Sequence, residues 1–180
     1  MKKLAIIASI VAAFAGVNAA QAASTGTITF NGELTASTCD VSVDGQGPDA
    51  TVVLPTVGTN QLTAATQVAG STGFNMALSN CAGTLKTVSA FFEAGPSVDV
   101  VTGHLKNVGG TAGLVSLELM DASNAMTPIK AGNSDQTTST TYIDATTGSA
   151  SLPYAVQYYA DGETTAGTVV SNVVYSIQYK

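Results

Sequence analysis

The chain has 180 residues, with 12 acidic and 6 basic side chains and a formal net charge of −6. All the basic residues are lysines, and there is a single histidine. This balance excludes a protein that tracks nucleic-acid phosphates, because such proteins carry clusters of arginine and lysine. One histidine and two cysteines cannot by themselves build a multi-ligand His/Cys metal site, and we expect no cofactor. The length fits one domain of ordinary size.

Residues 1–22 have the order of a secretory signal peptide. Lys2 and Lys3 precede an apolar run over residues 4–17, and residues 20–22 (Ala-Gln-Ala) form a small-x-small cleavage site. The apolar run is short for a membrane span, which needs about 20 residues. We therefore expect cleavage after the signal and export of an acidic mature chain.

Export changes the interpretation of the cysteines. Cys39 and Cys81 are the only two, and an oxidising compartment favours a disulfide between them. Closing the loop between these two cysteines stabilises the folded state by roughly 4 kcal/mol in the chain-entropy model. A reactive thiol pair is the alternative, but there is no CxxC spacing and no base close by in the sequence.

The mature chain is patterned as strands. Period-two alternation dominates, and abundant Thr, Val, Ser and Gly suit sheets and turns. In chain order we expect strands over residues 27–34, 39–43, 51–57, 74–81, 87–93, 100–107, 114–120, 149–159 and 168–179. Pro55 indicates an edge or an end of its strand. Residues 58–69 are ambiguous between coil and a short helical turn, and residues 131–148 predict a long surface loop.

Short strands with frequent turn signals predict an all-β sandwich. Both ends are unusual for a self-contained one. An amphipathic strand over residues 26–34 stands before the first cysteine, and the last predicted strand runs almost to Lys180. A terminal strand outside any hairpin can leave its own domain, and an open sheet edge is a template for another chain. The alternation alone leaves open an ordinary sandwich whose first strand pairs internally.

Several short motifs occur in a recognisable order. They are Ile28-x-Phe30-x-Gly32-x-Leu34 before Cys39, Phe74-x-Met76-x-Leu78-x-x-Cys81, Leu117-x-Leu119-x-Asp121, Tyr154-x-Val156-x-Tyr158, and the closing Tyr175-x-Ile177-x-Tyr179-Lys180. This set covers nearly all of the mature chain and resembles pilins of the chaperone–usher pathway, in particular those of type 1 fimbriae. The final lysine departs from the polar, often uncharged residue that is common at that place.

The resemblance implies an incomplete immunoglobulin-like β-sandwich that lacks its last strand, with an N-terminal donor-strand extension. It divides the chain into a signal peptide (1–22), the extension (23–36) and a pilin domain (37–180). The donor-strand residues would be Gly26, Ile28, Phe30, Gly32 and Leu34. The acceptor groove and the chaperone contact would involve Val173, Tyr175, Ile177, Tyr179 and Lys180.

The function implied by the resemblance is that of a structural subunit of a surface fimbria, polymerising head to tail by donor-strand exchange. Its partners would be identical or homologous pilin subunits, a periplasmic chaperone and an outer-membrane usher, with no nucleic acid. A host receptor would be reached only through the assembled fibre. The alternative that stays open is a minor adaptor or adhesive subunit of the same type of fibre.

An enzyme is not expected. A Ser-His-Asp arrangement could use only His104, and no Gly-x-Ser-x-Gly motif supports it. We expect His104 to be a solvated residue and the acidic side chains to lie on solvated faces.

Overall fold

The computed structural model describes residues 26–32, 34 and 38–180; the expected signal peptide, with residues 23–25, 33 and 35–37, lies outside them. The chain divides into two compact units at residues 33 and 34. In the first unit, residues 26–32 form neither helix nor strand, and Ile28 and Phe30 are 77% and 88% exposed. The described part of the predicted strand over residues 27–34 is therefore not a strand in this structure, since a strand requires a hydrogen-bonded partner.

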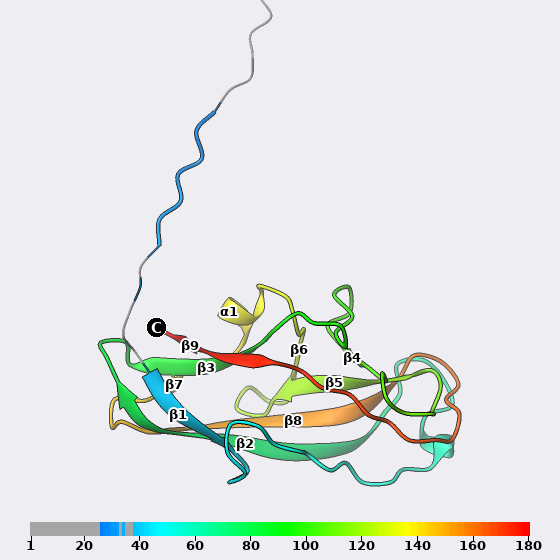
Figure 1. Cartoon of the computed structure of the whole chain (residues 1–180). Helices are drawn as coiled ribbons and strands as arrows, with labels where there is room; N and C mark the ends of the chain where they lie inside the picture. The colour runs from blue at the N-terminus through cyan, green and yellow to red at the C-terminus, as the bar shows by residue number, and fades with distance from the viewer. Residues whose placement is uncertain (1–25, 33, 35–37) are drawn as a thin grey trace, which may run out of the picture. The chain divides into compact units, whose positions relative to one another are not determined.

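Two antiparallel sheets build the second unit (Figure 1). The larger sheet has the order β1-β2-β8-β5-β4, with β6 paired to β5, and the smaller sheet has the order β7-β3-β9. The strands are β1 Thr38–Val43, β2 Val68–Ala82, β3 Thr87–Phe92, β4 Leu105–Lys106, β5 Val115–Asp121, β6 Thr127–Ile129, β7 Ile143–Asp144, β8 Ala150–Ala160 and β9 Tyr175–Tyr179. The predicted all-β sandwich is confirmed.

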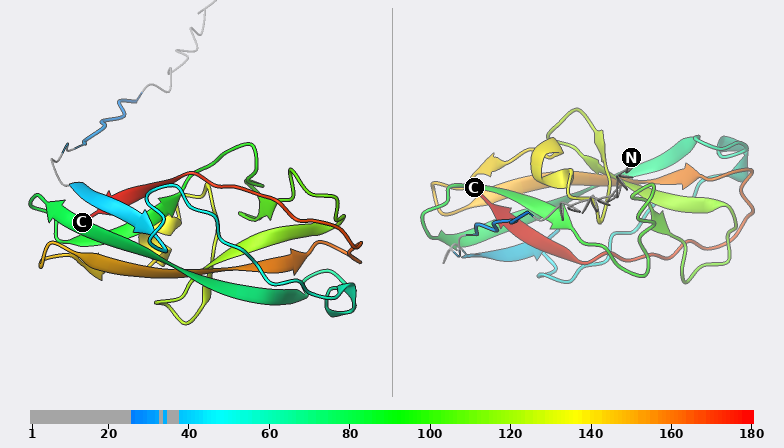
Figure 2. Two further views of the ribbon diagram at one scale, coloured as in Figure 1. Left: turned by 60° about the horizontal axis from the view of Figure 1, so that its bottom comes forward. Right: turned by 90° about the horizontal axis from the view of Figure 1, so that it is seen from above.

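The core lies between the two sheets, which Figure 2 shows as two layers from two directions. Alternate residues of β8, such as Leu152 and Tyr154, face inward, and Phe92 faces them from β3. The rings of Phe92 and Tyr154 meet edge to face, with centroids 5.2 Å apart. Period-two alternation produces this arrangement, because it gives each strand one apolar face.

A disulfide joins Cys39 in β1 to Cys81 near the end of β2, with the Cα atoms 4.1 Å apart. The predicted bridge is therefore present, and it ties the first strand of the domain to its neighbour in the sheet. No free cysteine occurs among the described residues.

Three predicted strands are shortened or missing. Residues 51–57 form no strand, because Pro55 cannot donate a backbone hydrogen bond to a ladder. Their side chains nevertheless alternate as predicted: Val52 and Leu54 are half-buried and Val53 is 80% exposed. The predicted strand at 100–107 is reduced to β4, since the chain turns at Gly103, where a Cβ would overlap Lys130. Of residues 168–179, only β9 is a strand; the preceding stretch bonds to a loop, as in Ala112 N–H to Thr168 O at 3.0 Å.

The predicted surface loop at residues 131–148 is partly wrong. It contains the short helix α1, Gln136–Ser139, and the strand β7, and Gln136 is almost completely buried. The ambiguous region at 58–69 holds a single 3₁₀ turn, Thr59–Gln61. No helix within the described ranges combines the length and the apolar character that crossing a membrane requires.

Candidate functional site

Strand β9 is an edge of the smaller sheet, with β3 as its only partner among the described strands. Thr87 and Lys180 exchange both backbone hydrogen bonds at 2.9 Å, and Glu93 N–H donates to Val174 O at 2.8 Å. Antiparallel strands alternate such pairs, so the even-numbered residues of this stretch bond to β3. The N–H and C=O groups of Tyr175, Ile177 and Tyr179 therefore point away from β3, where another strand can bond to them.

The opposite edge of the same sheet is filled. Strand β7 pairs with the first two residues of β3, and the Tyr154 hydroxyl accepts a hydrogen bond from Ala90 N–H at 2.9 Å. At Phe92, the Gln136 amide accepts from the N–H at 2.9 Å and donates to the C=O at 3.0 Å. The Gln136 side chain thus replaces a neighbouring strand. Among the described strands, β9 carries the edge of this sheet that is left open.

A cavity of about 680 Å³ lies beside this open edge. One wall comes from β1, through Cys39, Asp40 and Val41, and the other from residues 173–177; Pro48 and Asp49 complete it. Directly after β1, the Asp44 N–H bonds to Asn75 O at 2.9 Å, so the alternation turns the main-chain groups of Val41 and Val43 away from β2. Those of Val43 already bond to Gly47 O and Gln46 N–H. An added strand here would therefore meet free backbone groups along β9 and, on the β1 side, at Val41.

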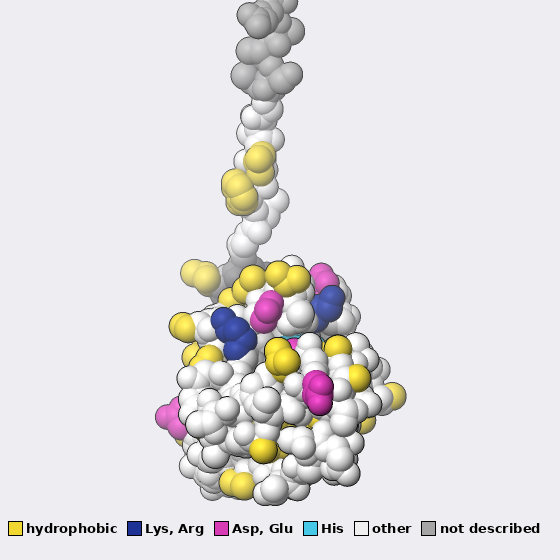
Figure 3. Space-filling model, turned by 90° about the vertical axis from the view of Figure 1, so that its right-hand side faces the viewer, with side chains coloured by type: hydrophobic (Ala, Val, Ile, Leu, Met, Phe, Trp, Pro, Cys, Tyr) yellow, Lys and Arg dark blue, Asp and Glu magenta, His cyan; other side chains and the backbone are white. Residues whose placement is uncertain are grey.

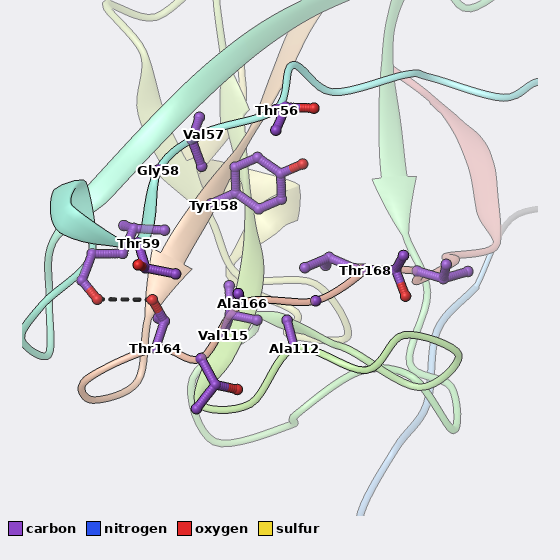
Figure 4. Close-up of a pocket in the computed structure, with 15 residues that line it drawn as sticks. Thr56, Val57, Gly58, Thr59, Ala112, Val115, Tyr158, Thr164, Ala166 and Thr168 are labelled. Atoms are coloured by element: carbon purple, nitrogen blue, oxygen red, sulfur yellow. Dashed lines mark hydrogen bonds between the residues drawn. The ribbon is translucent and has the colours of Figure 1, made fainter.

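A second cavity, of about 580 Å³, continues along the same stretch of chain. Figure 4 shows the Tyr158 ring, from β8, projecting between the segment 56–59 and the segment 164–168. Residues 164–170 line this cavity and residues 173–177 line the first, so both follow the chain segment that leads into β9. We call the two cavities together the β1–β9 groove.

The wall formed by residues 165–170 is held by close packing against the loop at 107–112. A Cβ added at Gly110 would overlap the carbonyl of Thr168, and one at Gly167 would overlap Ala112 N. The Asn107 side chain accepts from Val170 N–H at 2.8 Å and donates to Ala112 O at 2.9 Å. Glycine at these two positions lets the backbones approach closely enough for this network.

Apolar side chains along the groove are only half-buried, although they pack against the core. They are Val41, Tyr158, Val169, Val173, Tyr175 and Ile177. Ser171 occupies the same alternating face, and its buried hydroxyl has no hydrogen-bond partner among the described residues. The core is therefore incompletely covered on this side, in contrast to its fully buried centre.

Threonines, among them Thr56 and Thr168, and the carboxylates Asp40 and Asp49 also line the groove. The Tyr175 hydroxyl donates to Pro48 O at 2.7 Å and ties β9 to the turn after β1. Partial burial, with a smaller contribution from Asp49, raises the pKa of Tyr175 above 10.0, so the phenol stays neutral at physiological pH. No cluster of three or more potential metal ligands occurs in the described part of the chain. The groove is suited to an apolar strand rather than to an ion.

Some of the predicted acceptor residues line the groove and others do not. Val173, Tyr175 and Ile177 line the groove. Tyr179 is half-buried beyond it, and Lys180 directs its ammonium group to Thr137 O at 2.6 Å and over the Tyr142 ring at 3.7 Å. Only the backbone of Lys180 takes part in the sheet, through its bonds with Thr87.

The sequence reasoning missed the other wall of the groove, namely Cys39, Val41 and Pro48, and the Tyr158 ring. The alternation of Cys39 with Val41 and of Val156 with Tyr158 was a usable signal for inward-facing side chains. It could not show that these positions remain partly uncovered.

The expectation that His104 is solvated is wrong. Its side chain is 13% exposed, with Nε2 3.7 Å from an oxygen of Glu118, and its ring lies 4.3 Å from that of Tyr159. The Gln157 amide donates to Glu118 at 2.8 Å. His104 is placed there by the short pairing of β4 with β5, which carries Glu118. This cluster does not line the groove.

The expectation of solvated acids also fails at Asp121. This residue is 1% exposed, and its carboxylate accepts from Ser123 N–H at 2.9 Å and Thr141 N–H at 2.8 Å. Those bonds fix the turn after β5. Its role is structural, because its partners are main-chain donors of adjoining loops.

Hydrophobic side chains on the end of the domain seen in Figure 3 occur in small groups, separated by backbone, side chains of other types and a few charged side chains. Exposed apolar side chains of that kind are ordinary on protein surfaces. The groove is therefore the stronger candidate for a binding site.

Comparison with known proteins shows the family to which this chain belongs. The family model described as "FimA: Type-1 fimbrial protein, A" matches residues 54–180. The chain belongs to the type-1 fimbrial protein family. It is 43% identical over 161 residues to the major fimbrial subunit SMF-1 of Stenotrophomonas maltophilia, covering 87% of this chain and 94% of that protein. It is 35% identical to the F17 fimbrial protein of Escherichia coli over the full length of both.

Among solved structures, the fold is similar to that of the P pilus rod subunit PapA, with a TM-score of 0.60. The match covers 79% of this chain and 99% of that one, at 18% sequence identity, and supports the fold alone. As a member of this family the protein is a structural fimbrial subunit, not an enzyme. Membership also assigns it to a fimbria at the cell surface.

Proposed function

We propose that this fimbrial subunit polymerises head to tail by strand donation. Residues 26–34 of one copy add as a strand along β9 of another and fill its β1–β9 groove. The observation that carries the proposal is the open edge of β9, where the N–H and C=O groups of Tyr175, Ile177 and Tyr179 face a half-covered apolar groove. Strand addition of this kind takes affinity from backbone bonds and specificity from alternating side chains.

The donor segment has the matching pattern. Ile28, Phe30 and Leu34 are 77%, 88% and 102% exposed, so nearly all of their apolar surface can still be buried when the segment binds a neighbouring subunit. Burying three such side chains is worth on the order of 5–9 kcal/mol before backbone bonds are counted. Gly32 falls on the same alternating face and suits a narrow part of the groove, and Gly26 lies at the entry end of the strand.

The domain division that supports this model is a signal peptide at 1–22, a donor extension at 23–36 and a pilin domain at 37–180. The resemblance to chaperone–usher pilins adds the route: a periplasmic chaperone covers the groove first, and an outer-membrane usher exchanges it for the next subunit. One interface used repeatedly, donor to acceptor, generates an open fibre rather than a closed ring. Similarity to a major fimbrial subunit favours a place in the body of that fibre.

Deleting residues 24–34 from the mature chain tests the donor role. The variant should fold, form the Cys39–Cys81 disulfide and bind a donor peptide of residues 24–34, since its groove is unchanged. It should not extend a fibre beyond itself. Ladders of detergent-resistant oligomers formed by the deletion variant would contradict the proposal.

Alternation within the donor provides a matched control. Phe30→Asp places a charge in the groove and should abolish oligomer ladders, whereas Thr29→Asp places it on the outward face and should leave them. Gly32→Trp should slow assembly without unfolding the domain. Equal ladders from Phe30→Asp and Thr29→Asp would refute the proposed register.

A further inference from the structure

The donor segment contains a chemically labile pair, Asn31-Gly32. Both residues are exposed, and no atom lies within 4 Å of the place where a Cβ on Gly32 would be. Asparagine followed by glycine in an irregular, accessible segment is the favoured arrangement for spontaneous deamidation, since glycine leaves the backbone nitrogen unhindered and the chain free to turn. Asn31 is the one asparagine in this sequence that precedes glycine.

Asparagines of the folded domain are in a different situation. Asn107 Oδ1 accepts from Gly110 N–H at 2.9 Å, Asn133 Oδ1 accepts from Asp135 N–H at 2.8 Å, and Asn172 Oδ1 accepts from Ser97 Oγ at 3.0 Å. Each of these amides is fixed by the surrounding structure, and each precedes a residue with a side chain. Reaction is therefore directed to Asn31.

We propose that Asn31-Gly32 is a deamidation site that limits the lifetime of the unpolymerised subunit as a strand donor. The Gly32 nitrogen attacks Cγ of Asn31, a C–N bond forms, and ammonia leaves with the proton of that nitrogen. Water then opens the cyclic imide. Opening at Cγ gives aspartate, and opening at the main-chain carbonyl gives isoaspartate; no oxidant or reductant takes part.

The two products differ in their effect on donation, a consequence that rests on the proposed function. In the alternation of the donor strand, Asn31 lies on the face opposite Phe30 and Gly32. Aspartate there adds one outward charge and keeps the register. Isoaspartate adds a methylene to the main chain between residues 31 and 32, so Leu34 is displaced relative to Ile28 and Phe30, and one part of the strand loses its register.

Assembly protects the site. A strand that fills the β1–β9 groove lies along the open edge of β9, and the Gly32 N–H acquires a hydrogen bond when it faces the free carbonyl groups of that edge. The ring closure also requires Asn31 to rotate out of the extended conformation. Reaction within the fibre then requires local opening, and every 1.4 kcal/mol of opening free energy slows it about tenfold.

The test compares the unpolymerised mature chain with fibres assembled from it, aged together at neutral pH. Peptide mass mapping, with isoaspartate detected by methyltransferase labelling, follows residue 31. We expect isoaspartate to accumulate in the unpolymerised chain and to form at least about tenfold more slowly in fibres. The aged wild-type chain should lose most of its capacity to extend fibres. The Asn31→Gln variant, aged in the same way, should keep that capacity. Freshly prepared Asn31→Asp, which has not been aged, should assemble.

The outcomes separate this inference from the proposed function. Equal isoaspartate formation in the two samples, or equal loss of assembly by aged Asn31→Gln, would overturn the inference. If the deletion of residues 24–34 still blocked assembly in that case, the donor role would stand. Assembly by the deletion variant would overturn the donor role itself and the protection that depends on it.

Discussion

Replacing Gln136 by leucine tests how the smaller sheet keeps one edge closed. The side chain is 1% exposed and makes two hydrogen bonds with the main chain of Phe92, at 2.9 and 3.0 Å. Leucine keeps much of the volume but leaves the N–H of Phe92 buried without a partner, whereas the C=O keeps the hydrogen bond from Gly132 N–H at 2.8 Å. Each such group costs about 1–3 kcal/mol. With one such group left, we expect a loss of about 2 kcal/mol in the free energy of unfolding, from a total of about 5–15.

Equilibrium unfolding in urea measures this loss. With a slope of about 2 kcal/mol per molar, the midpoint should fall by about 1 M. Gln136→Glu is the matched control: its carboxylate still accepts from Phe92 N–H at neutral pH but cannot donate to the C=O, and protonation in acid restores a donor. An unchanged midpoint for Gln136→Leu would show that the amide does not substitute for a strand.

Three further predictions concern single groups. Tyr154→Phe should cost about 1–3 kcal/mol in urea unfolding, because it removes the acceptor of the buried Ala90 N–H; an unchanged midpoint would refute that role. Ser171→Ala should leave the free energy of unfolding equal or higher, since the buried hydroxyl has no partner among the described residues, and a clear decrease would contradict this. Hydrogen bonds from the His104 side chain and, to a smaller extent, the Gln157 amide hold the pKa of Glu118 below its ordinary 4.5. The stability that ionised Glu118 contributes is therefore complete above pH 4.5 and is lost as the pH falls through the lowered pKa. Glu118→Gln should remove that acid dependence in unfolding curves.

Alternation predicted the long, buried strands well. In β5 and β8 each inward residue has a buried position between two partner strands, so the apolar period directly reports the fold. The same signal failed at residues 51–57, where Val52 and Leu54 face inward without any ladder. Periodicity records which side chains are covered, and it says nothing of whether a hydrogen-bonded neighbour exists.

Gln136 and Lys180 show what sequence could not supply. Glutamine within a Thr-rich, Ser-rich stretch predicts exposure, yet this amide is buried because the main chain of Phe92 needs partners there. Lys180 follows the alternating strand, but its ammonium group is engaged with Thr137 and Tyr142. Such contacts join segments distant in the chain, and local pattern carries no record of them. The sequence suggested an open edge at the last strand, and the register of its bonds shows which backbone groups of β9 are free.

The blocked β3 edge of the smaller sheet has a consequence for the form that an assembly of subunits can take. With β3 capped by Tyr154 and Gln136, and with β4 only two residues long, β9 and the facing β1 form the one site of useful length for an incoming chain among the described strands. A subunit that accepts one strand and donates one, as we propose, cannot form branches. Fibres built in this way would be unbranched, and their number would be set by initiation events.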